Sequence, residues 1–269
     1  MCSSDLSLFG CEIRAALAGF RSDNVPLMNI HYLDNPDIGT IILHRVAKVD
    51  GLTVSATLAL APKDAKKAFE KGQEALGKRN PDEAQKNFQK AVEIYPRHAA
   101  AWFELGKIQE QRDHTEEARK AYEQSIGADS KYVPPHQRLA AMAFNEKQWQ
   151  VLADQSAEVL KLDPVDYPDA YYMNAVAQLQ LMHFDVAEKQ VREAIRLDSS
   201  KKMLRAYYIL GLAQAQQEHY SDAAQSIRTF LAGAGEAQDV AAVRTQLEQI
   251  EQLVKENSGA GPAAPGRAQ

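Results

Sequence analysis

The stretch HAAAWFELGKIQEQRDHTEEARKAYEQSIGAD (98–129) is one copy of a unit that recurs five times between residues 65 and 236. One column of small residues marks the first half of each copy: Gly72, Gly106, Ala140, Ala175 and Gly211. A second column, of alanines with one leucine, marks the second half: Ala84, Ala118, Leu152, Ala187 and Ala223. The two columns lie 12 residues apart in every copy, and successive copies are 34, 34, 35 and 36 residues apart. Because extra residues occur only between copies, this period predicts a stacked array of repeats.

Each copy is predicted to form two helices, represented by residues 98–113 and 115–129. Apolar residues recur in them at spacings of three and four: Trp102, Leu105 and Ile108, then Ala118, Tyr122 and Ile126. This spacing is typical of amphipathic helices. Two antiparallel helices joined by a tight turn can approach closely only where a small residue lies at their crossing. Turn and breaker residues also keep the period: Asn80-Pro81, Asp113-His114, Pro96 and Pro164.

These motifs resemble a tetratricopeptide repeat (TPR) array, whose units carry Trp, Leu-Gly, Tyr, Ala, an aromatic residue, Ala and Pro in a frame of 34. The second copy matches best, with Trp102, Leu105, Gly106, Ala118 and Tyr122. The resemblance implies a mainly α protein, a solenoid of five helix-turn-helix repeats at 65–98, 99–132, 133–166, 168–201 and 204–237. Phe230 stands where an alanine would face a following repeat, which fits an array that ends there. Residues 237–256 are predicted to form the capping helix that such solenoids need.

Residues 1–61 show a different pattern, which predicts a small, incomplete β-module. Strands are expected at 11–18, 38–46 and 52–60, the last because Leu52, Val54, Ala56, Leu58 and Leu60 alternate with other residues. The segment resembles the C-terminal part of a carboxypeptidase-regulatory-like β-sandwich domain, and we expect the earlier strands to lie upstream. An extracytoplasmic location, in the periplasm or envelope, follows if the N-terminus is truncated, and a cytoplasmic one otherwise. The tail 257–269 is predicted to be disordered.

Composition agrees with a folded protein that has a large core, since 45% of the 269 residues are hydrophobic and 25% charged. The net charge of -5 does not favour nucleic acid or an anionic membrane. The sequence has no apolar run near the roughly 18 residues of a membrane span. Cys2 and Cys11, the only cysteines, could bridge each other, pair with missing residues or remain thiols, and thiols are expected.

Catalytic chemistry is not expected from this sequence. Its histidines have no partner at metal-ligand spacing, and it contains no nucleophile elbow, P-loop or H-E-x-x-H motif. His114, His183 and His219 share one place, the turn between the two helices of a repeat. Repeats stand roughly 10 Å apart at the distance of packed helices, too far for shared metal ligation, so these histidines are interpreted as polar turn residues. We therefore predict no enzyme and no cofactor.

The resemblance implies a concave groove lined by the first helix of each repeat, with the fifth and ninth places pointing into it. The fifth places are Phe69, Phe103, Gln137, Tyr172 and Tyr208, and the ninth are Gln73, Lys107, Ala141, Val176 and Leu212. Lys66, Lys107 and Arg205 add positive charge to these aromatics, and aromatic and Arg side chains dominate binding energy at interfaces.

The predicted function is a non-catalytic scaffold that docks a protein or peptide segment in this groove. The clamp for chaperone-tail carboxylates, known in the family, is disfavoured because it needs Lys, Asn and Arg at these places in three successive repeats, where Lys107 is the only basic residue. Two alternatives remain open. One is a structural spacer whose groove is filled by the protein itself. The other is an envelope accessory protein whose β-module contacts carbohydrate or the cell surface.

Overall fold

The computed structural model describes residues 53–198, 202–234 and 240–259, together with five short strands within the first 52 residues. Helices dominate the described part, which confirms the prediction of a mainly α solenoid. They are α1 (Ala56–Leu60), α2 (Lys63–Gly77), α3 (Pro81–Ile94), α4 (Ala99–Gln111), α5 (Thr115–Ala128), α6 (Val133–Asn145), α7 (Trp149–Leu162), α8 (Pro168–Gln180), α9 (Phe184–Leu197), α10 (Leu204–Gln216), α11 (Tyr220–Gly233) and α12 (Val240–Gly259).

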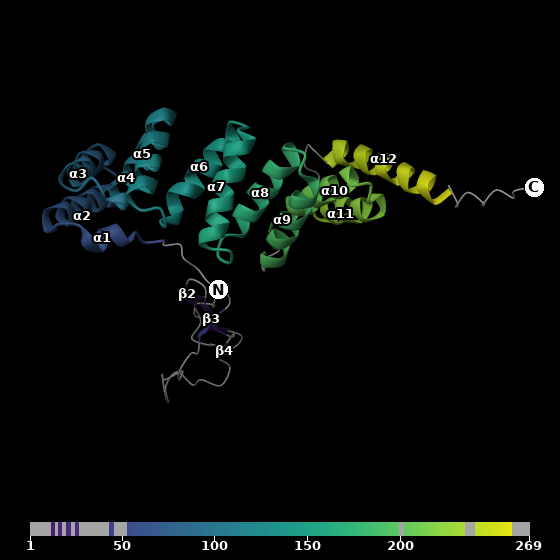
Figure 1. Ribbon diagram of the computed structural model, residues 1–269, viewed down its shortest axis with the longest axis horizontal. Helices are drawn as coiled ribbons and strands as arrows, with labels where there is room; N and C mark the ends of the chain where they lie inside the picture. Colours follow the sequence, from purple (N-terminus) through teal and green to yellow (C-terminus); the bar gives the residue numbers. More distant parts are fainter. Residues whose placement is uncertain are drawn as a thin grey trace, which may run out of the picture.

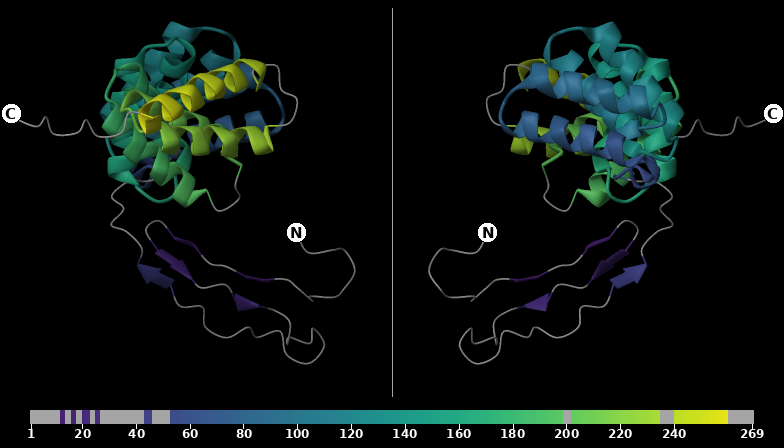
Figure 2. Two further views of the ribbon diagram at one scale, coloured as in Figure 1. Left: turned by 90° about the vertical axis from the view of Figure 1, so that its right-hand side faces the viewer. Right: turned by 90° about the vertical axis from the view of Figure 1, so that its left-hand side faces the viewer.

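The helices form five pairs that stack in a row (Figure 1). Each pair consists of an even-numbered helix from α2 to α10 and the odd-numbered helix that follows it, and the two pack along each other. The second helix of each pair also contacts the first helix of the next pair. At the C-terminal end, α12 packs against α11, with Val243 and Ile250 buried, as Figure 2 shows from that end. The core is therefore a continuous layer between stacked pairs, as expected for a solenoid.

The small-residue columns set the distance between the helices of a pair. A Cβ added to Gly72 would lie 2.5 Å from Phe88 Cε1, and one added to Gly211 would lie 2.5 Å from Ile227 Cγ1. The residues at this facing position are Phe88, Tyr122, Ser156, Val191 and Ile227. The two smallest of them, Ser156 and Val191, occur in the two repeats whose first column holds alanine instead of glycine. Small and large residues therefore compensate across the helix pair, which keeps the packing dense.

Each turn between paired helices has the same backbone. Five residues have a positive φ of 57° to 63°, one in each turn: Arg79, Asp113, Lys147, Met182 and Glu218. In the first turn Arg79 N donates to Leu76 O and Asn80 N donates to Ala75 O, both at 2.9 Å. The other four turns repeat this pair of bonds, which is the Schellman motif at a helix C-terminus. The residue after the positive φ is the N-cap of the next helix, and in three turns it is a predicted turn histidine: His114, His183 or His219.

The segment 52–60, predicted as a strand, is a correction, because residues 56–60 form the helix α1. Ser55 caps this helix, its Oγ accepting from Thr57 N at 3.2 Å. The Asp129 carboxylate then accepts from Ser55 Oγ at 2.6 Å and from Ala56 N at 3.0 Å. Thr57 is buried and its Oγ1 accepts from Ala99 N, at the start of α4. Contacts distant in sequence thus hold this short segment in a helical turn.

Five short strands occur in the N-terminal segment. β1 (Glu12–Ile13) pairs antiparallel with β4 (Val25–Pro26), and β3 (Phe20–Ser22) pairs antiparallel with β2 (Ala16–Leu17) and β5 (Leu43–Arg45). Apart from these strands, the predicted β-module, including Cys2 and Cys11, lies outside the described residues.

The C-terminal helix reaches further than the sequence predicted. It continues to Gly259, so residues 257–259 of the predicted disordered tail are helical, and the rest of the tail lies outside the described residues. No helix in the described ranges has the length and apolar character needed to cross a membrane.

Candidate partner-binding groove

Two pockets open along the first helices of the repeats. The first, here called the α4–α6 pocket, has a volume of about 430 Å³ and is lined by Phe103, Lys107, Glu110, Gln111 and Arg138. The second, the α8–α10 pocket, has a volume of about 460 Å³ and is lined by Asp169, Tyr172, Lys202, Met203, Leu204, Arg205, Ala206, Phe230, Gly233 and Ala234. Both volumes are within the roughly 300–1,000 Å³ of typical ligand sites.

The aromatic floor of the α4–α6 pocket is Phe103. Its ring centroid lies 5.7 Å from that of Tyr122 and 5.6 Å from that of Tyr132, the second in an edge-on arrangement. Lys107 Nζ lies 5.5 Å from the centre of the Phe103 ring and 2.8 Å from a carboxylate oxygen of Glu104. The ring is therefore fixed from below and covered by a cation from above.

One wall of this pocket is a hydrogen-bonded network between two repeats. Tyr122 Oη donates to Glu110 Oε2 at 2.6 Å, and Arg138 Nε donates to the same oxygen at 3.1 Å, while the Arg138 guanidinium makes a second bond to Glu110 Oε1. Burial, followed by the neighbouring Glu110, raises the pKa of Tyr122, so that its hydroxyl remains a donor. A bidentate Arg–carboxylate pair of this kind fixes the position of both side chains.

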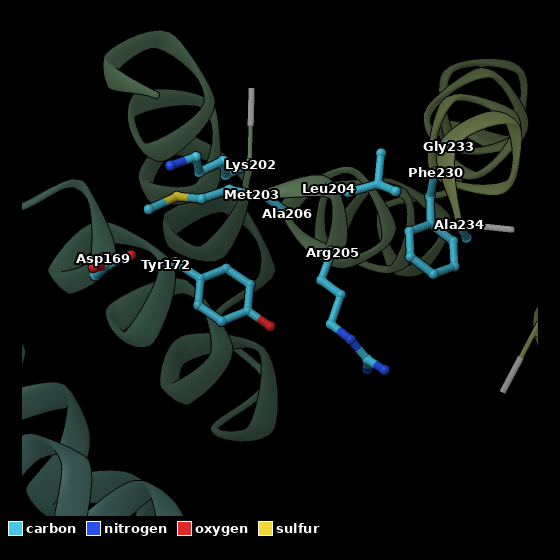
Figure 3. Close-up of a pocket in the computed structure, with 10 residues that line it drawn as sticks. All are labelled: Asp169, Tyr172, Lys202, Met203, Leu204, Arg205, Ala206, Phe230, Gly233 and Ala234. Atoms are coloured by element: carbon cyan, nitrogen blue, oxygen red, sulfur yellow. The ribbon is translucent and has the colours of Figure 1, made fainter. Parts of the chain in front are cut away.

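The α8–α10 pocket combines an apolar lining with positive charge. Figure 3 shows Tyr172 projecting from α8, Arg205 from the first turn of α10 and Phe230 from α11, around the same opening. Gly233 permits α11 to approach α10, since an added Cβ would lie 2.8 Å from Leu204 Cδ1. Burial raises the pKa of the Tyr172 hydroxyl, and the nearby Arg205 charge lowers it to a smaller extent. Arg205 and Lys202 are both exposed.

Four of the predicted groove residues come together in these two pockets. Phe103 and Lys107 line the α4–α6 pocket, and Tyr172 and Arg205 line the α8–α10 pocket. The remaining predicted residues line neither of them.

Two predicted groove residues lie in the core instead. Phe69 is only 5% exposed, and its ring centroid lies 5.4 Å from that of Phe88 and 4.7 Å from that of His98. Val176 is 8% exposed and belongs to the apolar cluster between repeats four and five. For these two positions the expectation of an exposed groove side chain is wrong, because rings and helices of neighbouring repeats cover them.

The other predicted residues have partners or positions of their own. Tyr208 Oη donates to Gln246 Oε1 of α12 at 2.7 Å, and its ring centroid lies 5.5 Å from that of Phe230. Lys66 Nζ donates to the backbone oxygen of Ala59 in α1 at 2.7 Å. Gln73 is exposed and Gln137 half-buried. The terminal helix therefore contacts the last ring of the predicted groove, but Phe103 and Tyr172 line open pockets.

Sequence reasoning missed several pocket residues. Glu110 and Arg138 lie on consecutive first helices, one turn away from the places assigned to the groove, and their opposite charges were the available signal. Lys202 and Met203 lie in a connection between repeats, which the repeat frame does not assign to the groove. Phe230 was noted only as a sign of the end of the array.

A metal centre is not visible in the described ranges, where no group of three or more His, Cys, Asp or Glu side chains is placed to hold an ion. His114 and His183 each lie beside a glutamine of the preceding helix, with Nδ1 3.0 Å from Gln109 Oε1 and 2.8 Å from Gln178 Oε1. These histidines are thus part of the turn structure.

Comparison with known proteins gives the repeat type. A tetratricopeptide-repeat family model matches residues 69–133 and 172–238, so the chain contains tetratricopeptide repeats. No curated protein sequence matches the chain.

Solved structures of similar fold include three TPR or TPR-like proteins. YrrB, described as a TPR protein with an unusual peptide-binding site, has a TM-score of 0.60 and 15% identity, covering 70% of this chain and 96% of its own. A TPR protein from Parabacteroides merdae has a TM-score of 0.56 and 15% identity, with coverages of 74% and 77%. MamA has a TM-score of 0.54 and 18% identity, with coverages of 76% and 99%. At these identities the likeness concerns the fold alone.

Proposed function

We propose that this chain is a non-catalytic scaffold that docks a segment of a protein partner along the first helices of its repeats. The observation that carries the proposal is the pair of open pockets in which an aromatic ring and a cation from first helices lie together, Phe103 with Lys107 and Tyr172 with Arg205. Large rings beside cations are typical of sites that bind peptide segments with useful affinity. Tetratricopeptide-repeat proteins are generally scaffolds of this kind, and the structurally similar YrrB is described as having a peptide-binding site.

Binding is proposed to occur in a preformed site. The floor ring Phe103 is packed against two tyrosines, and the wall residue Arg138 is held by Glu110. Because these side chains are already ordered, a partner segment would lose its own conformational entropy but impose little on the scaffold. An extended or helical segment that carries apolar side chains is the partner expected here.

The test uses a random display library of 12-residue peptides fused at their C-termini, so that no peptide has a free C-terminal carboxylate. The wild-type chain should select peptides that the Phe103→Ala/Tyr172→Ala variant does not bind. Since Phe103 also contributes to packing, a second variant, Lys107→Glu/Arg205→Glu, changes the same pockets through exposed or half-exposed charges. Circular dichroism must show unchanged helical content in both variants.

The matched control is Lys90→Glu/Lys120→Glu, which makes the same charge change on exposed positions of the second helices α3 and α5. This control should bind the selected peptides like the wild type. If the selected peptides bind both pocket variants as tightly as the wild type, the proposed groove is wrong.

The structural spacer is the second candidate, and two observations favour it. Phe69 is covered by neighbouring rings, and Tyr208 is bonded to α12, so part of the predicted groove is filled by the protein itself. A spacer would select no peptide in the same experiment. The envelope alternative depends on the N-terminal segment, most of which lies outside the described residues.

A further inference from the structure

The α8–α10 pocket has a charge opposite in sign to that of the whole chain. The net charge of the protein is -5, but this pocket carries two cations, Lys202 and Arg205, against one carboxylate, Asp169. Clefts lined by one sign of charge concentrate ligands of the opposite sign. The pocket is therefore electrostatically suited to an anionic group.

The α4–α6 pocket does not have this property. Its Lys107 forms an ion pair with Glu104 at 2.8 Å, and its Arg138 forms an ion pair with Glu110. The two cations are thus compensated by two carboxylates on the same wall. Any preference for an acidic ligand should arise at repeats four and five.

The start of α10 adds to the positive potential. Its first turn contains no acidic side chain, and its N-cap residue Met203 makes no side-chain capping bond. The nearby Asp198 carboxylate is directed to the backbone of the connection, where Oδ2 accepts from Met203 N at 2.7 Å. The amide groups of a helix N-terminus carry partial positive charge, and here Arg205 lies in the same turn.

The rest of the pocket is apolar. Tyr172, Leu204 and Phe230 surround the opening from three helices, as Figure 3 shows. Burial raises the pKa of Tyr172, which keeps its hydroxyl uncharged, so this ring adds no negative charge to the pocket. An apolar centre bordered by cations suits one large apolar side chain with carboxylates on either side.

We propose that the α8–α10 pocket binds an acidic peptide segment, with one large apolar side chain between Tyr172 and Phe230 and neighbouring Asp or Glu side chains at Lys202 and Arg205. This inference rests on the proposed scaffold function and specifies the partner chemistry of that site. The anions are side-chain carboxylates within the segment, so a C-terminal carboxylate is not required.

The test is the composition of the peptides selected from the C-terminally fused 12-residue library. The wild-type chain should enrich Asp and Glu around a single Leu, Ile, Met or Phe. The Lys202→Glu/Arg205→Glu variant should bind those peptides at least about tenfold more weakly, because like charges would then face each other. A new selection with this variant should enrich Lys and Arg instead. The Lys90→Glu/Lys120→Glu control should retain wild-type affinity.

The outcomes separate this inference from the function on which it rests. If peptides are selected and depend on Phe103 and Tyr172, but show no acidic excess or bind the Lys202→Glu/Arg205→Glu variant as well as the wild type, the scaffold proposal stands and the acidic preference is wrong. If no peptide is selected, both are wrong. Since Lys202 and Arg205 are exposed, and Glu is favourable in the first turn of a helix, the variant is expected to fold.

Discussion

The ring of Tyr122 lies directly against the backbone of Gly106. A Cβ added to this glycine would be 2.5 Å from Tyr122 Cε1 and 2.6 Å from Cδ1, closer than real Cβ atoms approach any neighbour. The ring is fully buried, and its hydroxyl is bonded to Glu110 at 2.6 Å, so it has no space to retreat. The α4–α5 pair therefore packs at a distance that requires glycine at this position.

Gly106→Ala is expected to destabilise the protein. Forcing a methyl group into a packed site costs about 1–3 kcal/mol, whereas the higher helix propensity of alanine returns only about 0.8–1 kcal/mol. The urea midpoint should therefore fall, as measured by circular dichroism at 222 nm.

The matched control for this substitution is Gly127→Ala in α5. This glycine is exposed, and an added Cβ would meet nothing within 4 Å. Only the gain in helix propensity applies, so the unfolding free energy should rise by up to about 1 kcal/mol. Two shifts in the same direction would contradict the packing explanation for Gly106.

The positions of these contacts could be predicted because the repeat keeps a fixed frame. The column Gly72, Gly106, Ala140, Ala175 and Gly211 identified the crossing points of the helices before any coordinates. The facing residue was not identified, although it follows the same period. Ser156 in repeat three and Val191 in repeat four, beside Ala140 and Ala175, show the compensation in the sequence itself.

Met182→Gly is expected to stabilise the turn between α8 and α9. Met182 has a φ of 63° and is 72% exposed, so it bears backbone strain and contributes little burial. The left-handed conformation costs a residue with a Cβ about 1–2 kcal/mol, and the greater unfolded-state entropy of glycine offsets part of this gain. The net expectation is an increase of about 0.5–1 kcal/mol in the unfolding free energy, measured by urea denaturation. Met182→Val should change it in the opposite direction, because a β-branched residue tolerates positive φ least.

The segment 52–60 shows where a local pattern fails. Alternating apolar residues predicted a strand, but five alternating positions with Ala and Leu are also compatible with a helical turn. The choice is made by Asp129, a residue more than 70 positions away, which binds the first residues of α1. No local property of the segment contains that information.

Asp129→Asn is therefore expected to loosen α1. The change replaces a carboxylate oxygen that accepts from Ser55 Oγ and Ala56 N with a group that supplies fewer acceptors and no charge. Hydrogen bonds to charged groups contribute about 1.5–3 kcal/mol, so the amides of residues 57–61 should exchange with solvent at least about tenfold faster in hydrogen-exchange mass spectrometry. Asp163→Asn alters the equivalent residue after α7, which bonds to Val165 N and Asp166 N and not to α1. If both variants protect α1 equally, Asp129 does not hold it.

The groove was predicted in part for a similar reason. The repeat frame identifies which positions face the first-helix surface, and Phe103 and Tyr172 are at open pockets as expected. It does not show what the neighbouring elements cover. Phe69 is enclosed because Phe88 and His98 approach it, and Tyr208 is occupied by α12. Such coverage depends on side-chain sizes in adjacent repeats and on a helix that lies outside the repeat frame.

The stability of the protein is expected to fall in mild acid because of His98. This side chain is fully buried, and its Nδ1 accepts from Ala101 N at 3.2 Å, which caps α4. Its Nε2 has no hydrogen-bond partner among the described residues, and Phe69 and Tyr95 lie beside the ring. Burial lowers the pKa of His98 below its ordinary value of 6.5, opposed in part by its backbone hydrogen bond. Protonation would remove the capping acceptor and leave a charge in an apolar site.

The sign of the effect follows from proton binding. Between the lowered pKa and 6.5 the unfolded chain binds more protons than the native one, so the unfolding free energy decreases as the pH falls through this window. Above about pH 6.5 this contribution is complete and constant. Thermal midpoints measured at pH 7.5, 6.5 and 5.5 should decline over the lower interval. His98→Asn keeps an N-cap acceptor without a titrating group. It should lower the midpoint at pH 7.5 through lost packing but reduce the decline between pH 6.5 and 5.5. The exposed His219→Asn should leave the decline unchanged, and an equal decline in wild type and His98→Asn would exclude His98 as its source.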